Sequence, residues 1–149
     1  MNLSIYKMDP SDLDEVLSIE NSVSLIPWSK NLFIEEMQSS FSLCFVIKDD
    51  NRPERPVMGF ICFRNIAEES ELLNIGVHSE YQKTGIGKKL MEFYIDFSDR
   101  SGIKIFYLEV NSSNRPALHL YHLFSYRPTG VRHKFYQGKY DAFRMERTL

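Results

Sequence analysis

The spacing of hydrophobic residues changes several times along the chain, and each change predicts a different kind of element. The first residues, NLSIYK, alternate between polar and apolar and predict a short strand. Apolar residues then recur at helical spacing from 13 to about 22, behind the helix-start signal Asp9-Pro10-Ser11. A second helix is expected after residue 27, with Ser29 as its N-cap and Trp28 packed against Phe33.

The middle of the chain changes from strand-like runs to alternating strands and helices. SLCFVIK, PVMGFICFRNI and ELLNIGV are separated by short polar breaks and predict successive antiparallel strands. An amphipathic helix is expected to follow as far as about Arg100, with Gly102 as its C-cap. KIFYLEV predicts a continuously buried strand, and Asn114 is the expected N-cap of the next helix.

The last fifth of the chain predicts two strands around Gln137-Gly138-Lys139. The expected order of elements is therefore βααβββαβαββ. A strand–helix–strand unit in the middle implies a right-handed crossover, and hence a parallel pair inside a mixed sheet. A chain of 149 residues without repeats or linkers fits a single domain, residues 1–149.

Composition narrows the classes of protein that remain. The net charge is −2, which gives no general attraction to nucleic acid or to an anionic membrane. No apolar run approaches the length of about 18 residues that spans a bilayer, and the N-terminus lacks a signal-peptide pattern. Cys44 and Cys62 lie in apolar segments and are expected to be free buried thiols, without the ligand spacing of a zinc site. We therefore expect a soluble cytoplasmic protein without a metal.

The segment YQKTGIGKKL predicts a phosphate-binding loop. It does not fit the nucleotide P-loop, because Gln82 stands at the first glycine position and Lys89 replaces the magnesium-binding Ser or Thr. The dinucleotide fingerprint fails because Leu90 takes the position of the third glycine. The pattern Q-x-x-G-x-G between a strand and a helix remains. Its glycines permit several N–H groups to converge on an anion at the helix N-terminus. A plain glycine loop with a lysine-rich face is the alternative.

The residues around this loop resemble a known family. LLNIGVHSEYQKTGIGKKLMEF is similar to the acetyl-CoA-binding motif of the GNAT superfamily of N-acetyltransferases, and FYLEVNSSNRPALHLYHLFSY resembles the strand and helix that follow it. With IENSVSLIPWS, the resemblance extends over nearly the whole chain, and within the superfamily it is greatest to the RimI-like ribosomal-protein-alanine N-acetyltransferases. It implies the α/β (α+β) GNAT fold. In that fold about seven strands form a mixed, mostly antiparallel sheet with a central parallel pair and helices on both faces.

The resemblance also implies the co-substrate, acetyl-CoA, and the residues that bind it. Its pyrophosphate would be held by backbone groups of Lys83, Thr84, Gly85, Ile86, Gly87 and Lys88. Asn114 matches the family asparagine that contacts the cofactor, and Ile75, Gly76 and Val77 match the strand that pairs with the pantetheine arm. A glycine inside a strand often marks a bulge or a close backbone approach, which suits Gly76. The N–H group of Val77 is expected to stabilise the oxyanion.

Two residues are candidates for acid–base catalysis. Glu109 is a carboxylate at the end of an apolar strand, and it matches the catalytic glutamate of RimI-like enzymes. From spacing alone, it could equally be paired with a surface lysine. Tyr121 matches the family's general acid, although its spacing with Leu118 and Phe124 is that of a core stripe. The sequence departs from the family pattern at Ser125, where a glycine is usual.

The function implied is transfer of an acetyl group to the N-terminal α-amine of a protein, with the N-terminal alanine of a ribosomal protein as the expected acceptor. Two alternatives are a GNAT enzyme acting on a small amine or a lysine side chain, and a non-catalytic CoA-binding module. No direct nucleic-acid or membrane partner is expected, and the protein should be a monomer or a weak dimer.

Overall fold

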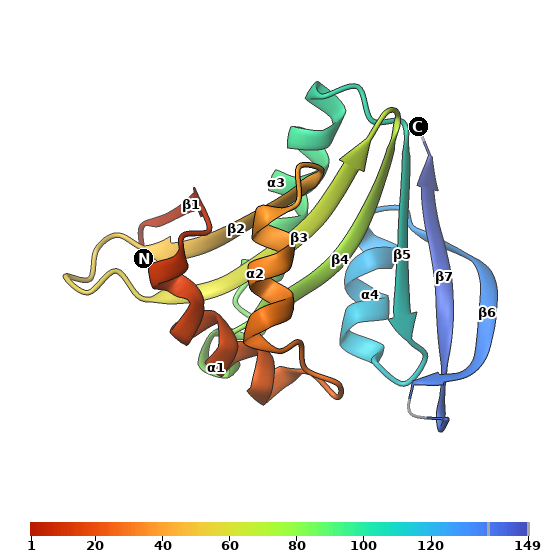
Figure 1. The fold of residues 1–149 in the computed structure, drawn as a ribbon, viewed down its shortest axis with the longest axis horizontal. Helices are drawn as coiled ribbons and strands as arrows, with labels where there is room; N and C mark the ends of the chain where they lie inside the picture. The colour runs from red at the N-terminus through yellow and green to blue at the C-terminus, as the bar shows by residue number, and fades with distance from the viewer. Residues whose placement is uncertain (137, 149) are drawn as a thin grey trace.

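The computed structural model describes residues 1–136 and 138–148, and its elements follow the predicted order (Figure 1). One seven-stranded sheet has the order β1-β2-β3-β4-β5-β7-β6. The strands are β1 Leu3–Lys7, β2 Ser42–Asp49, β3 Val57–Ile66, β4 Glu69–Val77, β5 Ile105–Asn111, β6 Arg127–Tyr136 and β7 Tyr140–Thr148. The helices are α1 Leu13–Val23, α2 Lys30–Gln38, α3 Ile86–Arg100 and α4 Arg115–Leu123, with short 3-10 helices η1 Pro10–Asp12 and η2 Ser79–Tyr81. Gln137, in the predicted final turn, lies outside the described residues.

The predicted N-caps of α2 and α4 are confirmed, whereas the C-cap of α3 is Ser101, one residue before the expected Gly102. The Ser29 hydroxyl accepts a hydrogen bond from the Leu32 N–H at 3.1 Å, and the Trp28 and Phe33 rings lie 5.0 Å apart. Gly102 ends α3 with φ at +89°, in the left-handed region that glycine adopts readily. The Asn114 side chain accepts from the Ala117 N–H at 3.2 Å and caps α4.

The helices cover the sheet in two layers, and each layer closes its own hydrophobic core. Helices α1 and α2 lie on one face, over β2 to β4, and α3 and α4 lie on the other face (Figure 1). The core under α1 and α2 contains Phe33 and Phe60. The core under α3 and α4 contains Leu90 and Phe106. Cys44 and Cys62 are free and buried, as expected, and they face each other across β2 and β3.

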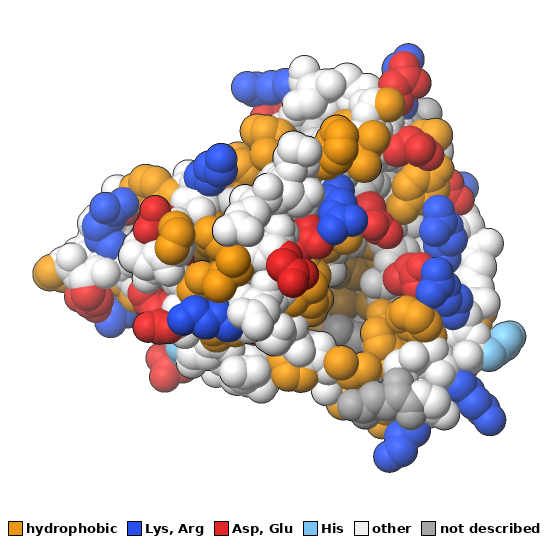
Figure 2. All heavy atoms as spheres, in the orientation of Figure 1, with side chains coloured by type: hydrophobic (Ala, Val, Ile, Leu, Met, Phe, Trp, Pro, Cys, Tyr) orange, Lys and Arg blue, Asp and Glu red, His pale blue; other side chains and the backbone are white. Residues whose placement is uncertain are grey.

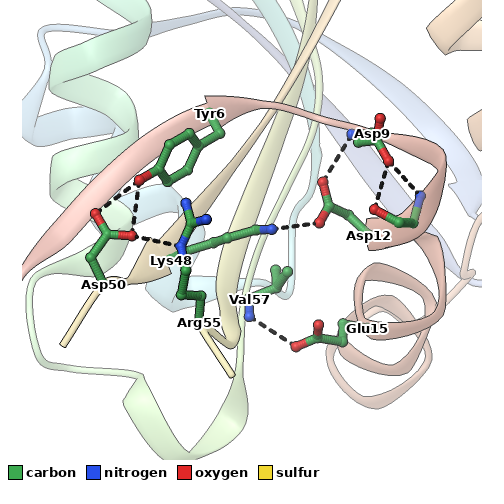
Figure 3. A network of polar contacts seen from close by, with 9 residues as sticks. Tyr6, Asp9, Asp12, Glu15, Lys48, Asp50, Arg55 and Val57 are labelled. Atoms are coloured by element: carbon green, nitrogen blue, oxygen red, sulfur yellow. Dashed lines mark hydrogen bonds and ion pairs between the residues drawn. The ribbon is translucent and has the colours of Figure 1, made fainter. Parts of the chain in front are cut away.

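Polar contacts fix the start of α1 against the sheet (Figure 3). Asp9 and Asp12 form a capping box at η1, and the carboxylate of Asp12 pairs with Lys48 of β2 at 2.8 Å. One turn later, the carboxylate of Glu15 accepts from the Val57 N–H at 2.9 Å. These contacts hold the helix over β3 and β4, so the other end of α1 is placed beside the middle of β4.

The parallel pair β4–β5 is short and then opens. Its ladder runs from Glu69 opposite Ile105 to Leu72 opposite Leu108, where the described pairing stops. On its other edge, β4 stays paired with β3, but the register shifts so that Leu73 is one extra residue between Leu72 and Asn74. An extra residue bends a strand and increases its twist. The bend takes the rest of β4 away from β5.

Two expectations about strands need correction. The strand containing KIFYLEV is not continuously buried, because every second side chain of β5 is only partly covered. Helices α1 and α2 lie over β2 to β4 and leave this face of β5 open. Gly76 does not mark the bulge either, which lies at Leu73. A Cβ at Gly76 would lie 2.6 Å from the Phe60 ring, so packing requires glycine there.

Candidate active site

A cavity of about 440 Å³ lies where β4 and β5 separate. Its walls are residues 72–75 of β4 and 108–111 of β5, together with the end of α1 and the loop before α2. Tyr121 of α4 and two tyrosines of the β6–β7 hairpin, Tyr136 and Tyr140, complete the lining. Figure 2 shows this hollow between the α1–α2 side and the hairpin, with hydrophobic side chains on its rim. The opening lies between strands, so it connects the two faces of the sheet.

Glu109 projects into this region from β5. Its strand neighbours Leu108 and Val110 belong to the core under α3 and α4, so Glu109 points to the opposite face, the face of α1 and α2. One carboxylate oxygen, Oε1, pairs with Nη2 of Arg132 at 3.2 Å. The other, Oε2, is buried without a hydrogen-bond partner among the described residues. A buried carboxylate oxygen with a free lone pair can accept a proton from a bound amine.

Tyr121 reaches the cavity from α4 and is buried. Burial raises the pKa of its phenol, and the nearby Tyr136 and Tyr94 add to the rise. The side chain is therefore a neutral O–H donor at physiological pH. Tyr121 is buried, as its core-stripe spacing allowed, and it also lines the cavity.

The end of α4 holds Tyr121 in place. The N–H of Ser125 bonds to the His122 carbonyl at 3.0 Å, and the N–H of Tyr126 bonds to the Tyr121 carbonyl at 3.2 Å. Together they form a Schellman motif, in which the residue at C′ is left-handed. Ser125 has φ at +67° there. Serine thus stands at the position where glycine is usual and still forms the Schellman motif. Its left-handed backbone is strained, because it carries a Cβ.

The loop before α3 has the geometry expected for binding an anion. Gly85 is the N-cap with φ at +89°, and Lys83 is also left-handed at φ +64°. The first intrahelical bond runs from the Lys89 N–H to the Gly85 carbonyl at 3.0 Å. The N–H groups of Ile86, Gly87 and Lys88 precede that bond, as in any first turn, and such groups can donate to an anion at a helix N-terminus.

The predicted cofactor-binding residues fall into two groups. Ile75 and Asn114 line the cavity together with Glu109 and Tyr121. The loop and first turn, residues 83–88, lie beyond the lining residues, but they adjoin the end of β4. The Gln82 amide donates to the Val77 carbonyl at 3.2 Å, and a Cβ on Gly87 would lie 3.8 Å from the Val77 side chain. A continuous path along β4 thus joins the loop to the cavity.

Several residues of the cavity were not predicted as site residues. Glu20 of α1 and Asn74 of β4 line it and are hydrogen-bonded to each other at 2.8 Å. Arg132 contacts Glu109 from the hairpin. One signal was available for Glu20, since it is a charged residue at an inward-facing position of an amphipathic helix. The contact of Arg132 with Glu109 depends on pairing across the sheet and has no local signal.

Within residues 1–136 and 138–148, no cluster of three or more His, Cys, Asp or Glu side chains could hold a metal ion. No described helix is long and apolar enough to cross a membrane.

The fold and the cavity define a mixed α/β protein with a site between two separating parallel strands, and comparison with known proteins identifies its family. Residues 12–126 match the Acetyltransferase (GNAT) family. The ribosomal protein bS18-alanine N-acetyltransferase of Escherichia coli K12 is 28% identical over 145 residues, covering 95% of each chain. The crystal structure of the E. coli ribosomal-protein-S18-alanine N-acetyltransferase superposes with a TM-score of 0.88 over 98% of this chain and 93% of that chain, at 28% identity. The complex of NAA60 from Arabidopsis thaliana with acetyl-CoA shares the fold, with a TM-score of 0.88 at 22% identity over 99% of each chain.

The chain belongs to the GNAT acetyltransferase family. It is therefore an N-acetyltransferase, and its similarity to the RimI-like enzymes extends over nearly its whole length.

Proposed function

We propose that this protein transfers the acetyl group of acetyl-CoA to the N-terminal α-amine of a protein, and that the acceptor is the N-terminal alanine of a ribosomal protein. One observation carries the proposal. A free carboxylate oxygen of Glu109 and the neutral phenol of Tyr121 border one cavity that passes between the two faces of the sheet. The names of the similar ribosomal-protein-alanine acetyltransferases support this choice of acceptor.

The residues present fit the acetyl donor. Beyond the Leu72–Leu108 pair, the edge of β4 toward β5 is open, and an arm that carries amide groups can add to a strand edge. That edge leads from the cavity at Ile75 to the N-terminus of α3, where residues 83–88 would hold the pyrophosphate. Asn114 borders the cavity at the start of α4. The donor would thus approach from the α3–α4 face.

The acceptor would approach from the opposite face, where Glu109 points. The amine nitrogen attacks the thioester carbonyl carbon, and its proton passes to Glu109 directly or through water. The carbon–sulfur bond breaks, and the thiolate takes a proton from Tyr121. Burial makes Tyr121 a weaker acid than a free tyrosine. The thiolate leaves in the same desolvated region, which raises its own proton affinity and favours the transfer.

The lining favours an amine with an apolar neighbour. It contains the carboxylates of Glu20 and Glu109 and no lysine or arginine among the described residues, while Arg132 pairs with Glu109 from outside the lining. The hydrophobic side chains of Leu25 and Ile26 at its rim are 53% and 41% exposed. An α-amine has a pKa of about 8 and a lysine amine about 10.4, so a far larger fraction of an α-amine is neutral near pH 7. An apolar rim and a mild base therefore favour a peptide N-terminus over a polyamine or a lysine side chain.

The proposal is tested by incubating the protein with acetyl-CoA and a peptide panel, followed by mass spectrometry. The panel contains peptides with N-terminal alanine, serine or methionine, and N-blocked peptides that contain lysine. We expect acetylation of free N-termini, fastest for alanine. Transfer only to lysine side chains would show that the acceptor is wrong. No transfer to any peptide, with acetyl-CoA still bound, would refute a protein acceptor and favour a small amine or a non-catalytic role. Cytoplasmic location and a monomeric or weakly dimeric state stay predictions.

A further inference from the structure

A second carboxylate in the cavity has no role in the mechanism above. Glu20 lies on α1, with 1% of its surface exposed, and it lines the cavity. Its Oε2 accepts hydrogen bonds from the Trp28 N–H at 2.9 Å and from the Asn74 side chain at 2.8 Å. Its Oε1 is buried and has no partner among the described residues. Oε2 therefore anchors the loop before α2, whereas Oε1 makes no hydrogen bond within the described residues.

An unpartnered oxygen on a buried carboxylate is costly, because burial removes its water without replacing the hydrogen bonds. Burial accordingly raises the pKa of Glu20. A hydrogen-bond donor that entered the cavity, above all a positively charged one, would offset this cost. The contacts within the chain explain why Oε2 is held in place, but they do not explain why Oε1 faces no donor.

Glu20 and Glu109 lie on the same face of the sheet. Asn74 points toward α1, because its side chain bonds to Glu20, whereas the next residue, Ile75, packs in the core under α3 and α4. Glu109 also points away from that core, as its neighbours Leu108 and Val110 show. The two carboxylates therefore border the cavity from α1, beside Asn74 of β4, and from β5, on the side opposite the proposed donor path.

We propose that Oε1 of Glu20 accepts a hydrogen bond from the acceptor amine, so that the nitrogen is held between Glu20 and Glu109 when it attacks. This inference rests on the proposed function, because it assigns a ligand to the same cavity. Glu20 takes no proton in the reaction; it positions the amine, and Glu109 receives the proton. An amine has enough N–H donors to serve both oxygens and still present its lone pair to the carbonyl carbon.

The test compares two ligands that differ only in the amine. One is an octapeptide with N-terminal alanine, and the other carries a propionyl group in place of that alanine. Binding of each to the protein saturated with CoA is measured by calorimetry. We expect the wild-type protein to bind the amine peptide at least about tenfold more tightly than the propionyl peptide, the usual effect of one hydrogen bond to a charged group.

The central variant is Glu20→Gln. Its amide oxygen can still accept from the Trp28 N–H and the Asn74 side chain, but an NH₂ group replaces the free oxygen. We expect about tenfold weaker binding of the amine peptide and less than about a twofold change for the propionyl peptide. Glu36→Gln is the matched control. Glu36 is also a buried helical glutamate, but it bonds to Arg64 and Ser42 and lies outside the cavity lining, so both affinities should stay unchanged.

Two results for Glu20→Gln would overturn the inference. Unchanged binding of the amine peptide would show that Oε1 does not contact it. Equal weakening of both peptides would show that Glu20 only positions the loop. Should Glu20→Gln fail to fold, Glu109→Gln gives an independent test, since it keeps Glu20. Loss of all preference for the amine peptide in that variant would contradict a contact with Glu20. Failure of the proposed function is distinct, because the wild-type protein would then leave the free N-termini of all peptides unacetylated, whatever the binding data for Glu20→Gln.

Discussion

The first four residues of β4 and β5 form an ordinary parallel pair, whereas the residues that follow form the walls of a cavity. In the paired half, the Tyr107 hydroxyl donates to the Glu69 carboxylate at 2.8 Å, and the Ser70 and Tyr94 hydroxyls are hydrogen-bonded at 2.6 Å, so these polar groups of the two strands have partners within the chain. In the open half, Glu20 and Glu109 each keep a buried oxygen without one among the described residues. One extra residue, Leu73, separates the two halves. The comparison teaches that the two strands separate directly after the bulge, and that the cavity with its two unpartnered carboxylate oxygens lies on the open side.

The largest expected effect comes from removing the base in the open half. Glu109→Gln should lower kcat about 1,000-fold, within the range of general acid–base catalysis, while acetyl-CoA binding stays near its wild-type value. The same substitution in the paired half, Glu71→Gln, should leave both unchanged because Glu71 is exposed and outside the cavity. Steady-state kinetics and calorimetry measure the two quantities. A Glu109→Gln enzyme with nearly full kcat would remove Glu109 from the mechanism.

The next comparison is between two buried tyrosines. Tyr121→Phe should lower kcat about 100-fold with little change in stability, because its hydroxyl borders the cavity. Tyr94→Phe should leave kcat nearly unchanged. It should lower the free energy of unfolding by about 1 kcal/mol, because the Tyr94 hydroxyl bonds to Ser70 in the paired half. Kinetics and urea denaturation distinguish these outcomes. Similar kcat losses in both variants would contradict an acid role that is specific to Tyr121.

The pH dependence of Tyr121 follows from its burial. Because burial raises the pKa of the phenol above the ordinary tyrosine pKa of about 10, Tyr121 stays protonated throughout the neutral and mildly basic range. Between pH 7 and 9, activity should therefore not fall through loss of this proton, and Tyr121→Phe should leave the shape of the kcat profile unchanged in that range. A basic limb near pH 8 that vanishes in Tyr121→Phe would contradict this assignment.

A smaller effect should distinguish alanine substitutions of the glycines at the two ends of α3. Gly85 and Gly102 both have φ at +89°, and a Cβ on either would meet no atom within 4 Å. Alanine at either position should therefore cost about 1 kcal/mol of stability through backbone strain alone. Only Gly85→Ala should also weaken acetyl-CoA binding, by about tenfold, because shifted N–H groups would no longer converge on the pyrophosphate. Equal affinities in the two variants would place the pyrophosphate elsewhere.

The smallest expected effect is a gain in stability. Ser125→Gly should raise the free energy of unfolding by about 1 kcal/mol, because glycine adopts the left-handed conformation at φ +67° without strain. Ser39→Gly at the end of α2 is the control, since φ there is −69° and the added chain flexibility should lower stability slightly. Thermal unfolding measures both. A loss of stability in Ser125→Gly would mean that the serine side chain makes a stabilising contact.

Much of this protein was determined by local sequence. Each predicted element is present, and Ser29 and Asn114 cap helices as expected, because capping depends on residues within one turn. The loop predicted to bind an anion was also recognisable as a glycine loop before a helix, since its glycines and the following helix lie together in the chain. Family resemblance then indicated Glu109 and Tyr121, and both border the cavity. Their catalytic roles stay predictions until the variants are measured.

Tertiary structure alone decided where the cavity opens and what else lines it. The extra residue Leu73 is visible only in the register between β3 and β4, and the open face of β5 depends on which strands α1 and α2 cover. Glu20 and Tyr140 line one cavity although about 120 residues separate them in the chain, and Arg132 pairs with Glu109 from the hairpin. Local patterns report what each residue prefers among its chain neighbours. The partners of a buried charge are set by packing between distant segments, which no local pattern encodes.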